Sequence, residues 1–415
     1  MKVLGLLLAL RFLGLFIVLP VLSIYALHLN GANEFTAGIA VGAYALSQLI
    51  FQIPFGRLGD KFDKKTLLIV GFILLGLGSL VCAFADNIYT LIFGRILQGA
   101  GAIGGVILAY IAEVVNEEER AKSFAFVGQF IALSFAISMV AGPLIGGKFG
   151  IDKLFLFTFL LSVIAIIMVV TIVPPAPKIE HFSEPPKFGE LLKNRDLQKL
   201  FFTGFMQKGL MTTFFMLVPI LFTQKLGWSK TDLWKIYVPA LIVGIGALPL
   251  GAILAEKKGK VKEVFIIGAT SMTGAIWLFA LQKSWAMFLA VILFFFGFNL
   301  IEPVLQSFVS KVVKANQKAT ALSTSNTIQY LGIFLGGAVA GFFLNKGMLE
   351  AFLIFAGIVG LIWIWLMAQF KPLMKLKVVE YEKFDPDFIE SLKTNPKVYD
   401  FYQKDGVLFV RYREE

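Results

Sequence analysis

The sequence contains one cysteine, Cys82, and two histidines, His28 and His181, among 415 residues. One cysteine cannot build a disulfide framework, and so few cysteines and histidines cannot form a metal centre from those ligands. Only 16% of the residues are charged, whereas about 25% is usual in soluble domains. We also find no nucleotide-binding loop, nucleophile elbow or cluster of metal ligands. These absences argue against a soluble enzyme, and we expect no catalysis, no cofactor and no bound metal.

Apolar residues are correspondingly abundant. Hydrophobic residues make up 58% of the chain, the mean hydropathy is +0.80, and there are 43 phenylalanines and 39 glycines. This composition is typical of a polytopic membrane protein, in which glycine is more frequent than in soluble helices. The net charge of +11 is compatible with nucleic-acid binding, but positive loops on the cytoplasmic membrane face explain it more simply. We therefore expect a lipid bilayer as a partner, and no nucleic acid.

Twelve apolar runs are each long enough to cross about 30 Å of hydrocarbon, and lipid surroundings require such spans to be helical. The first begins beside Lys2, contains Arg11 and lacks a small-residue cleavage site, which indicates a span rather than a cleavable signal peptide. The sequence therefore predicts an all-α membrane protein with twelve transmembrane helices. The predicted spans are about 3–28, 34–58, 65–85, 88–114, 122–149, 153–174, 198–223, 231–254, 263–282, 285–310, 318–344 and 348–370.

Basic residues are concentrated in alternate loops between these spans. The loops after spans 1, 9 and 11 carry none or one, whereas those after spans 2, 4, 8 and 10 carry two or more. By the positive-inside rule, the rich loops and both termini lie on the cytoplasmic side of an inner membrane. The residues that decide the orientation are Lys61, Lys64, Lys65, Arg120, Lys122, Lys257, Lys258, Lys260, Lys262, Lys311, Lys314 and Lys318.

The longest connection, residues 175–197, is proline-rich and charged, and it follows span 6. It predicts a cytoplasmic linker between an N-terminal six-helix half, 1–174, and a C-terminal six-helix half, 198–372. Within the linker, about 188–193 can form an amphipathic helix on the membrane surface. The remaining 373–415 is no longer membrane-like and predicts a small soluble cytoplasmic domain.

The two halves share features at equivalent positions. Pro54 and Gly56 at the end of span 2 recur as Pro249 and Gly251 at the end of span 8. Such repeats favour a duplicated architecture, in which two similar six-helix halves are related by an axis along the membrane normal.

The strongest local motif follows span 2 and runs from Gly56 to Lys65, with an acid placed among several bases. It resembles the loop signature G-x-L-x-D-R-x-G-R-K of the major facilitator superfamily, with Lys61 for the first arginine, Asp63 for the second glycine and Lys64 for the second arginine. A degenerate copy occupies the matching loop at 254–260. The resemblance implies a charge network of Asp60 and Lys64 with Glu113 that closes the cytoplasmic side in the outward-facing state. The expected conformational switch comprises Gly56, Leu58, Asp60, Lys61, Lys64, Lys65 and Glu113.

Spans 4 and 5 carry two further motifs of the same family. Arg95, Gln98 and Gly99 resemble R-x-x-Q-G, which is associated with proton coupling; alternatively, the arginine binds helix-end carbonyls and is structural. Span 5 resembles the antiporter signature G-x-x-x-G-P-x-x-G-G, with Ser138 in place of its first glycine, although the residues alone indicate only a kinked packing helix. The antiporter motif comprises Ser138, Gly142, Pro143, Gly146 and Gly147.

Together with the patterns of spans 1 and 10, these motifs make the chain similar to the drug:proton antiporter branch of the major facilitator superfamily. That branch implies efflux of small amphiphilic molecules in exchange for protons, by alternating access. Two alternatives stay open: a proton-coupled metabolite importer, and a non-transporting membrane sensor that acts through its C-terminal tail.

Four ionisable residues lie deep in the predicted spans 1, 4, 7 and 10, which line the central cavity in this family: Arg11, Arg95, Lys208 and Glu302. Because Glu302 is the only deep acid, it is either the proton carrier or one partner of a permanent ion pair with Lys208 or Arg11. Three cations against one acid favour anionic, zwitterionic or neutral substrates over cationic ones. Other candidate cavity residues, each alternatively a helix–helix hydrogen bond, are Gln48, Gln98, Gln207, Asn299, Asn326, Gln329 and Tyr330.

The tail has the pattern strand–helix–strand–strand. Leu376–Glu382 predicts a strand, Asp385 with Pro386 begins a helix, and Val398–Gln403 and Val407–Tyr412 alternate as strands around Asp405-Gly406. This is most of one half of a ferredoxin-like domain. At about 40 residues it is too small to be stable alone, so we expect it to pack on the membrane part or to self-associate.

Overall fold

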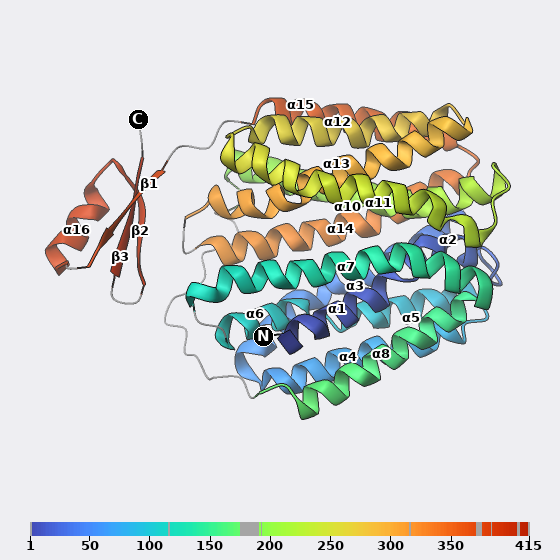
Figure 1. The fold of residues 1–415 in the computed structure, drawn as a ribbon, viewed down its shortest axis with the longest axis horizontal. Helices are drawn as coiled ribbons and strands as arrows, with labels where there is room; N and C mark the ends of the chain where they lie inside the picture. Colours follow the sequence, from blue (N-terminus) through green and yellow to red (C-terminus); the bar gives the residue numbers. More distant parts are fainter. Residues whose placement is uncertain are drawn as a thin grey trace.

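The computed structural model describes residues 2–114, 117–174, 191, 193–314, 317–370, 376–382, 384–404 and 407–413. Among these residues, 12 helical spans are long and apolar enough to cross a membrane, as the sequence predicts. They run alongside one another, with a small sheet beyond one end of the bundle (Figure 1). We call that end the tail end and the opposite one the far end.

The first six spans are built from eight helices, because two spans are interrupted. Span 1 breaks at Ile17 and Val18, just before Pro20, and span 4 breaks between Gly101 and Ile103. Discontinuous helices of this kind expose backbone carbonyls inside the bundle. The elements are α1 (Lys2–Phe16), α2 (Leu19–Ala26), α3 (Glu34–Lys61), α4 (Lys64–Ala83), α5 (Ile88–Ala100), α6 (Gly104–Val114), α7 (Glu117–Phe149) and α8 (Ile151–Thr171).

The second half contains an extra residue in the loop copy predicted from sequence. Asp60 follows Gly56 by four positions and Glu256 follows Gly251 by five, and a π-helical turn accommodates the additional residue. The elements are α10 (Arg195–Gln224), η1 (Lys230–Asp232), α11 (Trp234–Ala252), η2 (Ile253–Lys257), α12 (Val261–Ala280), α13 (Ser284–Lys311), α14 (Lys318–Asn345) and α15 (Leu349–Ala368).

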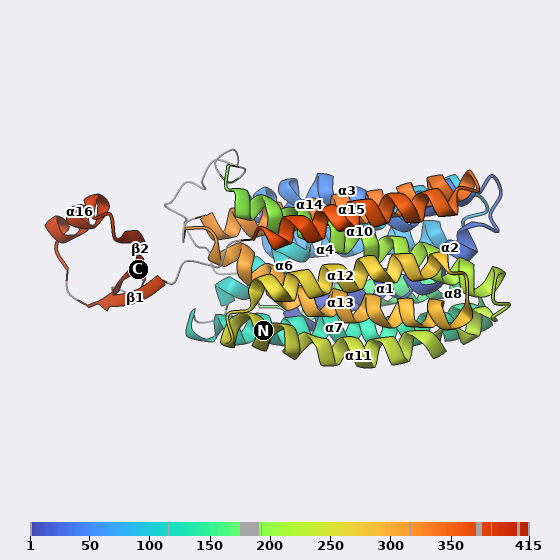
Figure 2. The same ribbon diagram turned by 90° about the horizontal axis from the view of Figure 1, so that it is seen from above.

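The two groups of spans lie side by side in the bundle (Figures 1 and 2). Helix α3 of the first half packs along α14 of the second, α2 packs on α10, and α7 packs on α11. These are the elements through which the halves can act on each other.

The tail folds as predicted from its pattern. Strands β1 (Leu376–Tyr381), β2 (Val398–Lys404) and β3 (Val407–Arg413) form an antiparallel sheet in the order β1-β3-β2, with α16 (Pro386–Thr394) on one face. Asp385 caps that helix by accepting a hydrogen bond from the Phe388 amide at 2.7 Å. Leu392, Leu408 and Val410 form its small core. The predicted Asp405-Gly406 turn, and all of the segment 188–193 except Leu191 and Lys193, lie outside the described residues.

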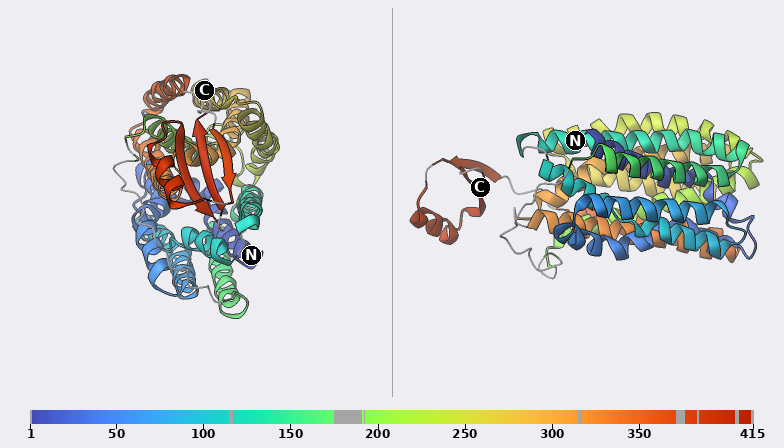
Figure 3. Two further views of the ribbon diagram at one scale, coloured as in Figure 1. Left: turned by 90° about the vertical axis from the view of Figure 1, so that its left-hand side faces the viewer. Right: turned by 90° about the horizontal axis from the view of Figure 1, so that it is seen from below.

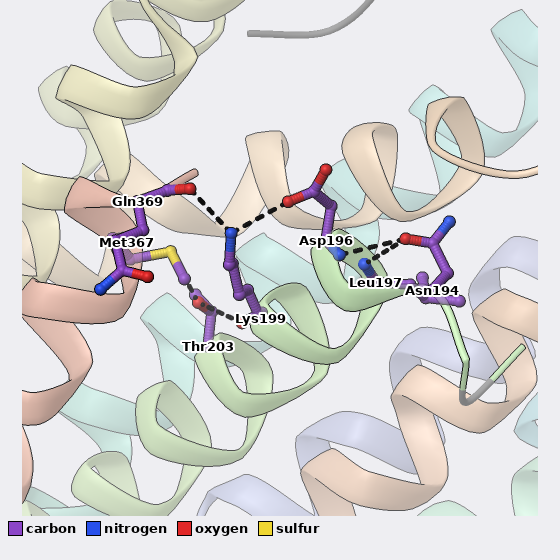
Figure 4. A network of polar contacts seen from close by, with 7 residues as sticks. All are labelled: Asn194, Asp196, Leu197, Lys199, Thr203, Met367 and Gln369. Atoms are coloured by element: carbon purple, nitrogen blue, oxygen red, sulfur yellow. Dashed lines mark hydrogen bonds and ion pairs between the residues drawn. The ribbon is translucent and has the colours of Figure 1, made fainter. Parts of the chain in front are cut away.

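At the tail end of the second half, polar contacts join the start of α10 to the end of α15 (Figure 4). The Lys199 ammonium donates to the Asp196 carboxylate at 3.1 Å and to the Gln369 carbonyl at 2.7 Å. A cation at the C-terminus of α15 meets the negative end of that helix dipole. The chain leaves the bundle for the tail from this point, and viewed end-on the sheet lies over the middle of the bundle (Figure 3).

Candidate functional site

The two halves close on each other at the far end. A Cβ on Gly38 would overlap the Gly337 carbonyl oxygen, and one on Gly147 would lie 2.8 Å from the Thr231 methyl group. Ser23 donates a hydrogen bond across the halves to the Phe215 carbonyl at 3.3 Å. Small residues allow such backbone contact between helices without lipid between them.

Toward the tail end the corresponding surfaces have space beside them. Gly56 on α3 and Gly128 on α7 are exposed, and a Cβ on either would meet no atom within 4 Å. Gly128 lies two helical turns from Phe135, a residue that contacts the second half, and so shares its face of α7. The close backbone contacts between the halves described above thus lie at the far end, whereas Gly56 and Gly128 have open space beside them.

An ion pair lies midway along α10 and α13. The Lys208 Nζ is 2.8 Å from both carboxylate oxygens of Glu302. Gln207 donates from Nε2 to the same carboxylate at 2.9 Å and to the Phe298 carbonyl at 2.9 Å, and Lys208 lies 4.6 Å from the Phe298 ring centroid. Glu302 thus accepts hydrogen bonds from two side chains, and the Lys208 ammonium also lies over the Phe298 ring. The charges of Lys208 and Glu302 balance each other, and these contacts fix both side chains.

The ion pair is not sealed from its surroundings. The Glu302 side chain is 38% exposed and that of Lys208 is 15% exposed. A carboxylate that is both paired and reachable can exchange one partner for another, including a proton. The structure brings Glu302 to Lys208 rather than to Arg11, which was the other partner considered from the sequence.

The two buried arginines instead bind backbone within the first half. Arg11 donates to the Gly101 carbonyl at 3.1 Å, at the break in span 4. Arg95 donates to the Ala40 carbonyl at 3.3 Å and to the Gln98 side chain at 2.7 Å. Both are at most 1% exposed, so their charges are met by carbonyl dipoles from neighbouring helices.

Most of the other predicted cavity residues have partners inside one half. Gln98 donates to Ser79 at 2.8 Å, Asn299 to the Phe295 carbonyl at 2.8 Å, and Gln329 to Ser325 at 3.1 Å. These side chains tie helices or helical turns together, which is the alternative that the sequence left open.

Asn326 likewise accepts from Gln306 at 3.3 Å within the second half. Two residues differ: Tyr330 lies within electrostatic range of Arg11 across the halves, and the buried Gln48 amide nitrogen has no partner among the described residues. Of the predicted cavity set, Gln207, Lys208 and Glu302 are brought together, whereas Arg95 and Gln98 form a separate group within the first half.

Sequence reasoning missed an aromatic cluster next to the ion pair. Phe135, Phe215, Tyr237 and Phe295 come from α7, α10, α11 and α13, and neighbouring rings are 6.1 to 6.4 Å apart. The signal that could have found part of it is spacing: Phe215 follows Lys208, and Phe295 precedes Glu302, by seven residues. On a helix that spacing places both on one face.

The predicted switch loop is described only in part. Asp63, which departs from the family signature, caps α4 by accepting from the Thr66 amide at 3.2 Å, so the substitution gains a helix cap where glycine would supply a turn. Lys64 is buried, and Lys65 and Leu58 are half-buried. The side chains of Asp60, Lys61 and Glu113 lie outside the described residues.

The antiporter-like motif in α7 packs where span 1 is interrupted. A Cβ on Gly142 would overlap the Ile17 carbonyl at that break, and one on Gly146 would lie 2.8 Å from a Leu154 methyl. Ser138 donates to the Ser134 carbonyl at 2.7 Å, one turn earlier in the same helix as Pro143. The motif is a close-packing surface between spans 5, 1 and 6.

The chain has twelve spans in two halves, which contact each other closely at one end, and a central ion pair. We next compared it with known proteins. The model of the Major Facilitator Superfamily matches residues 4–337 and, in a second match, residues 238–398. The chain belongs to this superfamily. It is 34% identical over 369 residues to the inner membrane transport protein YajR of Escherichia coli, and the match spans 88% of this chain and 81% of YajR.

Other superfamily members extend the comparison. Multidrug resistance protein 2 of Bacillus subtilis is 29% identical over 376 residues, covering 85% of this chain and 92% of that protein. The crystal structure of the nucleoside transporter NupG has a TM-score of 0.69 at 16% identity and covers 89% of this chain and 99% of that one. The chain is thus a membrane transporter of the Major Facilitator Superfamily.

Proposed function

We propose that this protein is a proton-coupled exporter of small amphiphilic molecules, which works by alternating access in an inner membrane with both termini cytoplasmic. The observation that carries the proposal is the reachable Lys208–Glu302 pair in the middle of the bundle. The multidrug resistance relative supports the export direction, and the basic loops at the tail end support the orientation. No enzyme activity forms part of this proposal.

Glu302 is the proposed proton carrier. A proton on its carboxylate removes the charge that holds Lys208, and loss of the proton restores the pair. Because the two states differ in a charge at the centre of the bundle, each can favour a different arrangement of the halves. Arg95 is the proposed second participant: its Nη2 is buried without a partner among the described residues, beside the Gln98 network.

Closure of the tail end is the proposed task of the loop after span 2. In the matching loop of the second half, Glu256 binds Ser307 at 2.5 Å and Lys311 at 2.8 Å, both at the end of α13. By the repeat, Asp60 would join the corresponding ends of the first half, together with Glu113 and Lys64. Gly56, Leu58, Lys61 and Lys65 would position this network.

The coupling restricts the substrate charge further. If a substrate carboxylate replaced Glu302 as the partner of Lys208, protonation of Glu302 would favour substrate binding, and both would move in the same direction. Exchange requires that proton and substrate exclude each other. Any ligand that binds ionised Glu302 meets this condition, a zwitterion and a neutral hydrogen-bond donor included. An anion does not, so of the three classes in the sequence prediction we keep the zwitterionic and the neutral one.

Transport by purified protein in proteoliposomes tests the proposal. The zwitterion norfloxacin, the cation ethidium and a small neutral sugar are supplied under an imposed pH gradient, and their flux is recorded against an internal pH dye. We expect norfloxacin to move against the proton gradient, and Glu302→Gln to abolish this dependence while binding persists. Glu350→Gln, at an exposed far-end position, is the matched control.

Each other outcome identifies a rival function. Uptake of the sugar together with protons would identify an importer. If none of the three compounds is transported but one of them still binds to the tail, a membrane sensor would be favoured. Unchanged pH dependence in Glu302→Gln would remove Glu302 as the carrier.

A further inference from the structure

The loop after α11 exposes a group of four lysines at the tail end. Lys257 is the last residue of η2, Lys258 and Lys260 follow it in the turn, and Lys262 is the second residue of α12. All four residues are exposed, and none of them has an ion-pair partner among the described residues. We call these four residues the lysine turn.

Backbone contacts hold the lysine turn in a compact shape. The Lys258 amide donates to the Ile253 carbonyl at 3.2 Å, and the Lys260 amide donates to the Leu254 carbonyl at 2.9 Å. Between these two lysines, Gly259 has a φ of +68°, a left-handed conformation that glycine adopts readily where a helix ends. The chain therefore turns within a few residues, and the lysines gather on a small area of the surface.

The acid nearest to this turn is already neutralised. Glu256 accepts hydrogen bonds from the Ser307 hydroxyl at 2.5 Å and from the Lys311 ammonium at 2.8 Å, both on α13. Its charge is thus balanced by a lysine outside the turn. The other acid of the loop is Glu263, next to Lys262, so the four lysines keep an excess of three positive charges over it. Because like charges held close together repel, an anion bound here would relieve that repulsion.

The matching loop of the first half is built differently. There Asp63 caps α4, Lys64 is buried and Lys65 is half-buried. The positive-inside rule accounts for lysines in both loops, but it does not require one set to be exposed as a group while the other is turned inward. The exposed group is therefore a property of the second loop.

An apolar strip leads along α11 and η2 to the lysine turn. Leu250, Ile253 and Lys257 follow one another at three or four positions, which places them on one helical face. Leu250 is 42% exposed and Ile253 is 43% exposed. Helix α11 lies along the edge of the bundle in Figure 2, and its apolar span ends at Lys257. In a bilayer this strip meets acyl chains, and the lysines lie where the hydrocarbon gives way to headgroups.

We infer that the lysine turn binds the headgroup of an anionic phospholipid in the leaflet at the tail end, while the acyl chains of that lipid lie along Leu250 and Ile253. Clusters of about four to eight basic residues next to a membrane span attract anionic headgroups. The excess of three positive charges favours a headgroup with two phosphates over a headgroup with one. This lipid site lies apart from the Lys208–Glu302 pair and is independent of the direction and coupling of transport.

Three oleoyl lipids test the inference on the full-length protein, which is freed of lipid in detergent and titrated in native mass spectrometry. Diphosphatidylglycerol carries two phosphate charges, phosphatidylglycerol carries one, and phosphatidylethanolamine has no net charge. We expect the first phosphatidylglycerol molecule to bind roughly tenfold more tightly than the first phosphatidylethanolamine molecule. Diphosphatidylglycerol should bind more tightly still.

A triple variant isolates the contribution of the lysine turn. Lys257→Gln, Lys258→Gln and Lys260→Gln together should remove most of the preference for the anionic lipids and leave phosphatidylethanolamine binding nearly unchanged. The charge-matched control should keep the preference, because its three glutamines replace exposed lysines at the far end, Lys225, Lys283 and Lys346.

Two further measurements separate a lipid from a free anion. Ile253→Ser should weaken all three lipids by a similar factor, because it removes a contact with the acyl chains and leaves the lysines in place. A large excess of inorganic phosphate should leave the bound lipid in place, because phosphate lacks those chains.

Four results would overturn the inference. They are an equal affinity for the three lipids, an equal loss of preference in the two triple variants, unchanged lipid binding in Ile253→Ser, and displacement of the lipid by phosphate, which would identify a site for small anions. The fold of each variant is checked by the thermal reactivity of Cys82, the single cysteine, which is buried.

Discussion

Lys208 and Glu302 stabilise the protein chiefly because each neutralises the buried charge of the other. Removing one partner leaves a charge inside the bundle without its counter-ion, which costs more than removing both. Partial exposure of Glu302 moderates the cost. We therefore expect Lys208→Met and Glu302→Gln each to lower stability by about 1–2 kcal/mol, and the double variant to lose less than the sum.

The temperature at which Cys82 becomes reactive toward a maleimide dye measures this effect, because the thiol is buried in the fold. Additive losses in the double variant would mean that the pair contributes no coupling energy. A Lys311→Met variant, which breaks the peripheral pair with Glu256, provides the comparison.

Arg95 illustrates a residue whose identity as arginine matters more than its charge. Its guanidinium donates in two directions, to the Ala40 carbonyl and to Gln98, and lies 4.7 Å from the Tyr44 ring centroid. A lysine is a point charge without this planar fork. We expect Arg95→Lys to destabilise the protein by about 1–3 kcal/mol and to raise Cys82 reactivity, since a Cβ on neighbouring Gly94 would lie 2.6 Å from that sulfur. An unchanged unfolding temperature would contradict the structural role.

Among the elements, α3 and α14 make the backbone contact on which far-end closure depends in the proposed mechanism. Gly38 and Gly337 allow the two backbones to touch at the far end, and any side chain on Gly38 would overlap the Gly337 carbonyl. We expect Gly38→Val to disfavour far-end closure, so that the halves separate there and transport falls about tenfold or more, as an equilibrium shift of about 1.4 kcal/mol would produce. Accessibility of an introduced cysteine at Thr212, which lies beside Gly337, should rise.

The control for this prediction is another helical glycine. A Cβ on Gly246 of α11 would meet no atom within 4 Å, so Gly246→Val should leave both flux and accessibility near their original values. Equal effects of the two variants would show that general helix weakening, and not closure, is responsible.

At the scale of the whole molecule, charges of the tail sheet lie within electrostatic range of the bundle. Lys318, at the start of α14, is half-buried, and burial together with Arg411 of the tail sheet lowers its pKa, while Asp400 opposes this. Since the docked arrangement disfavours protonated Lys318, docking should release protons and strengthen as the pH rises toward the ordinary lysine value. A tail that packs on the membrane part predicts this pH dependence, whereas a tail that only self-associates does not.

Spin labels at exposed Asn395 of the tail and Lys258 of the bundle measure this docking as a distance distribution. We expect the distribution to narrow between about pH 7 and about pH 10, the range below the ordinary lysine pKa, and Lys318→Met to be narrow throughout. Lys314→Met, an exposed neighbour, is the control. A distribution that broadens with pH, or one insensitive to Lys318, would contradict the prediction.

The sequence by itself determined the spans, the doubled architecture, the tail's strand–helix–strand–strand order and the superfamily. These follow from local rules: apolar length fixes the spans, and caps such as Asp385 with Pro386 fix helix starts. It also singled out Glu302 and Lys208, because buried charge is costly enough to be conspicuous in any apolar run. For Glu302 it left two partners open, since residue counting gives depth along a span but not which faces meet.

Tertiary structure alone decided those pairings. It joined Glu302 to Lys208, turned Arg11 and Arg95 toward backbone carbonyls of neighbouring helices, and gathered four rings from four helices, one of them from the opposite half. Helix rotation and the relative placement of the halves depend on side-chain packing among residues far apart in the chain, such as Arg11 with Gly101, which are 90 positions apart. No local pattern encodes that packing, so the arrangement of the central polar and aromatic side chains emerges only when the helices are placed together.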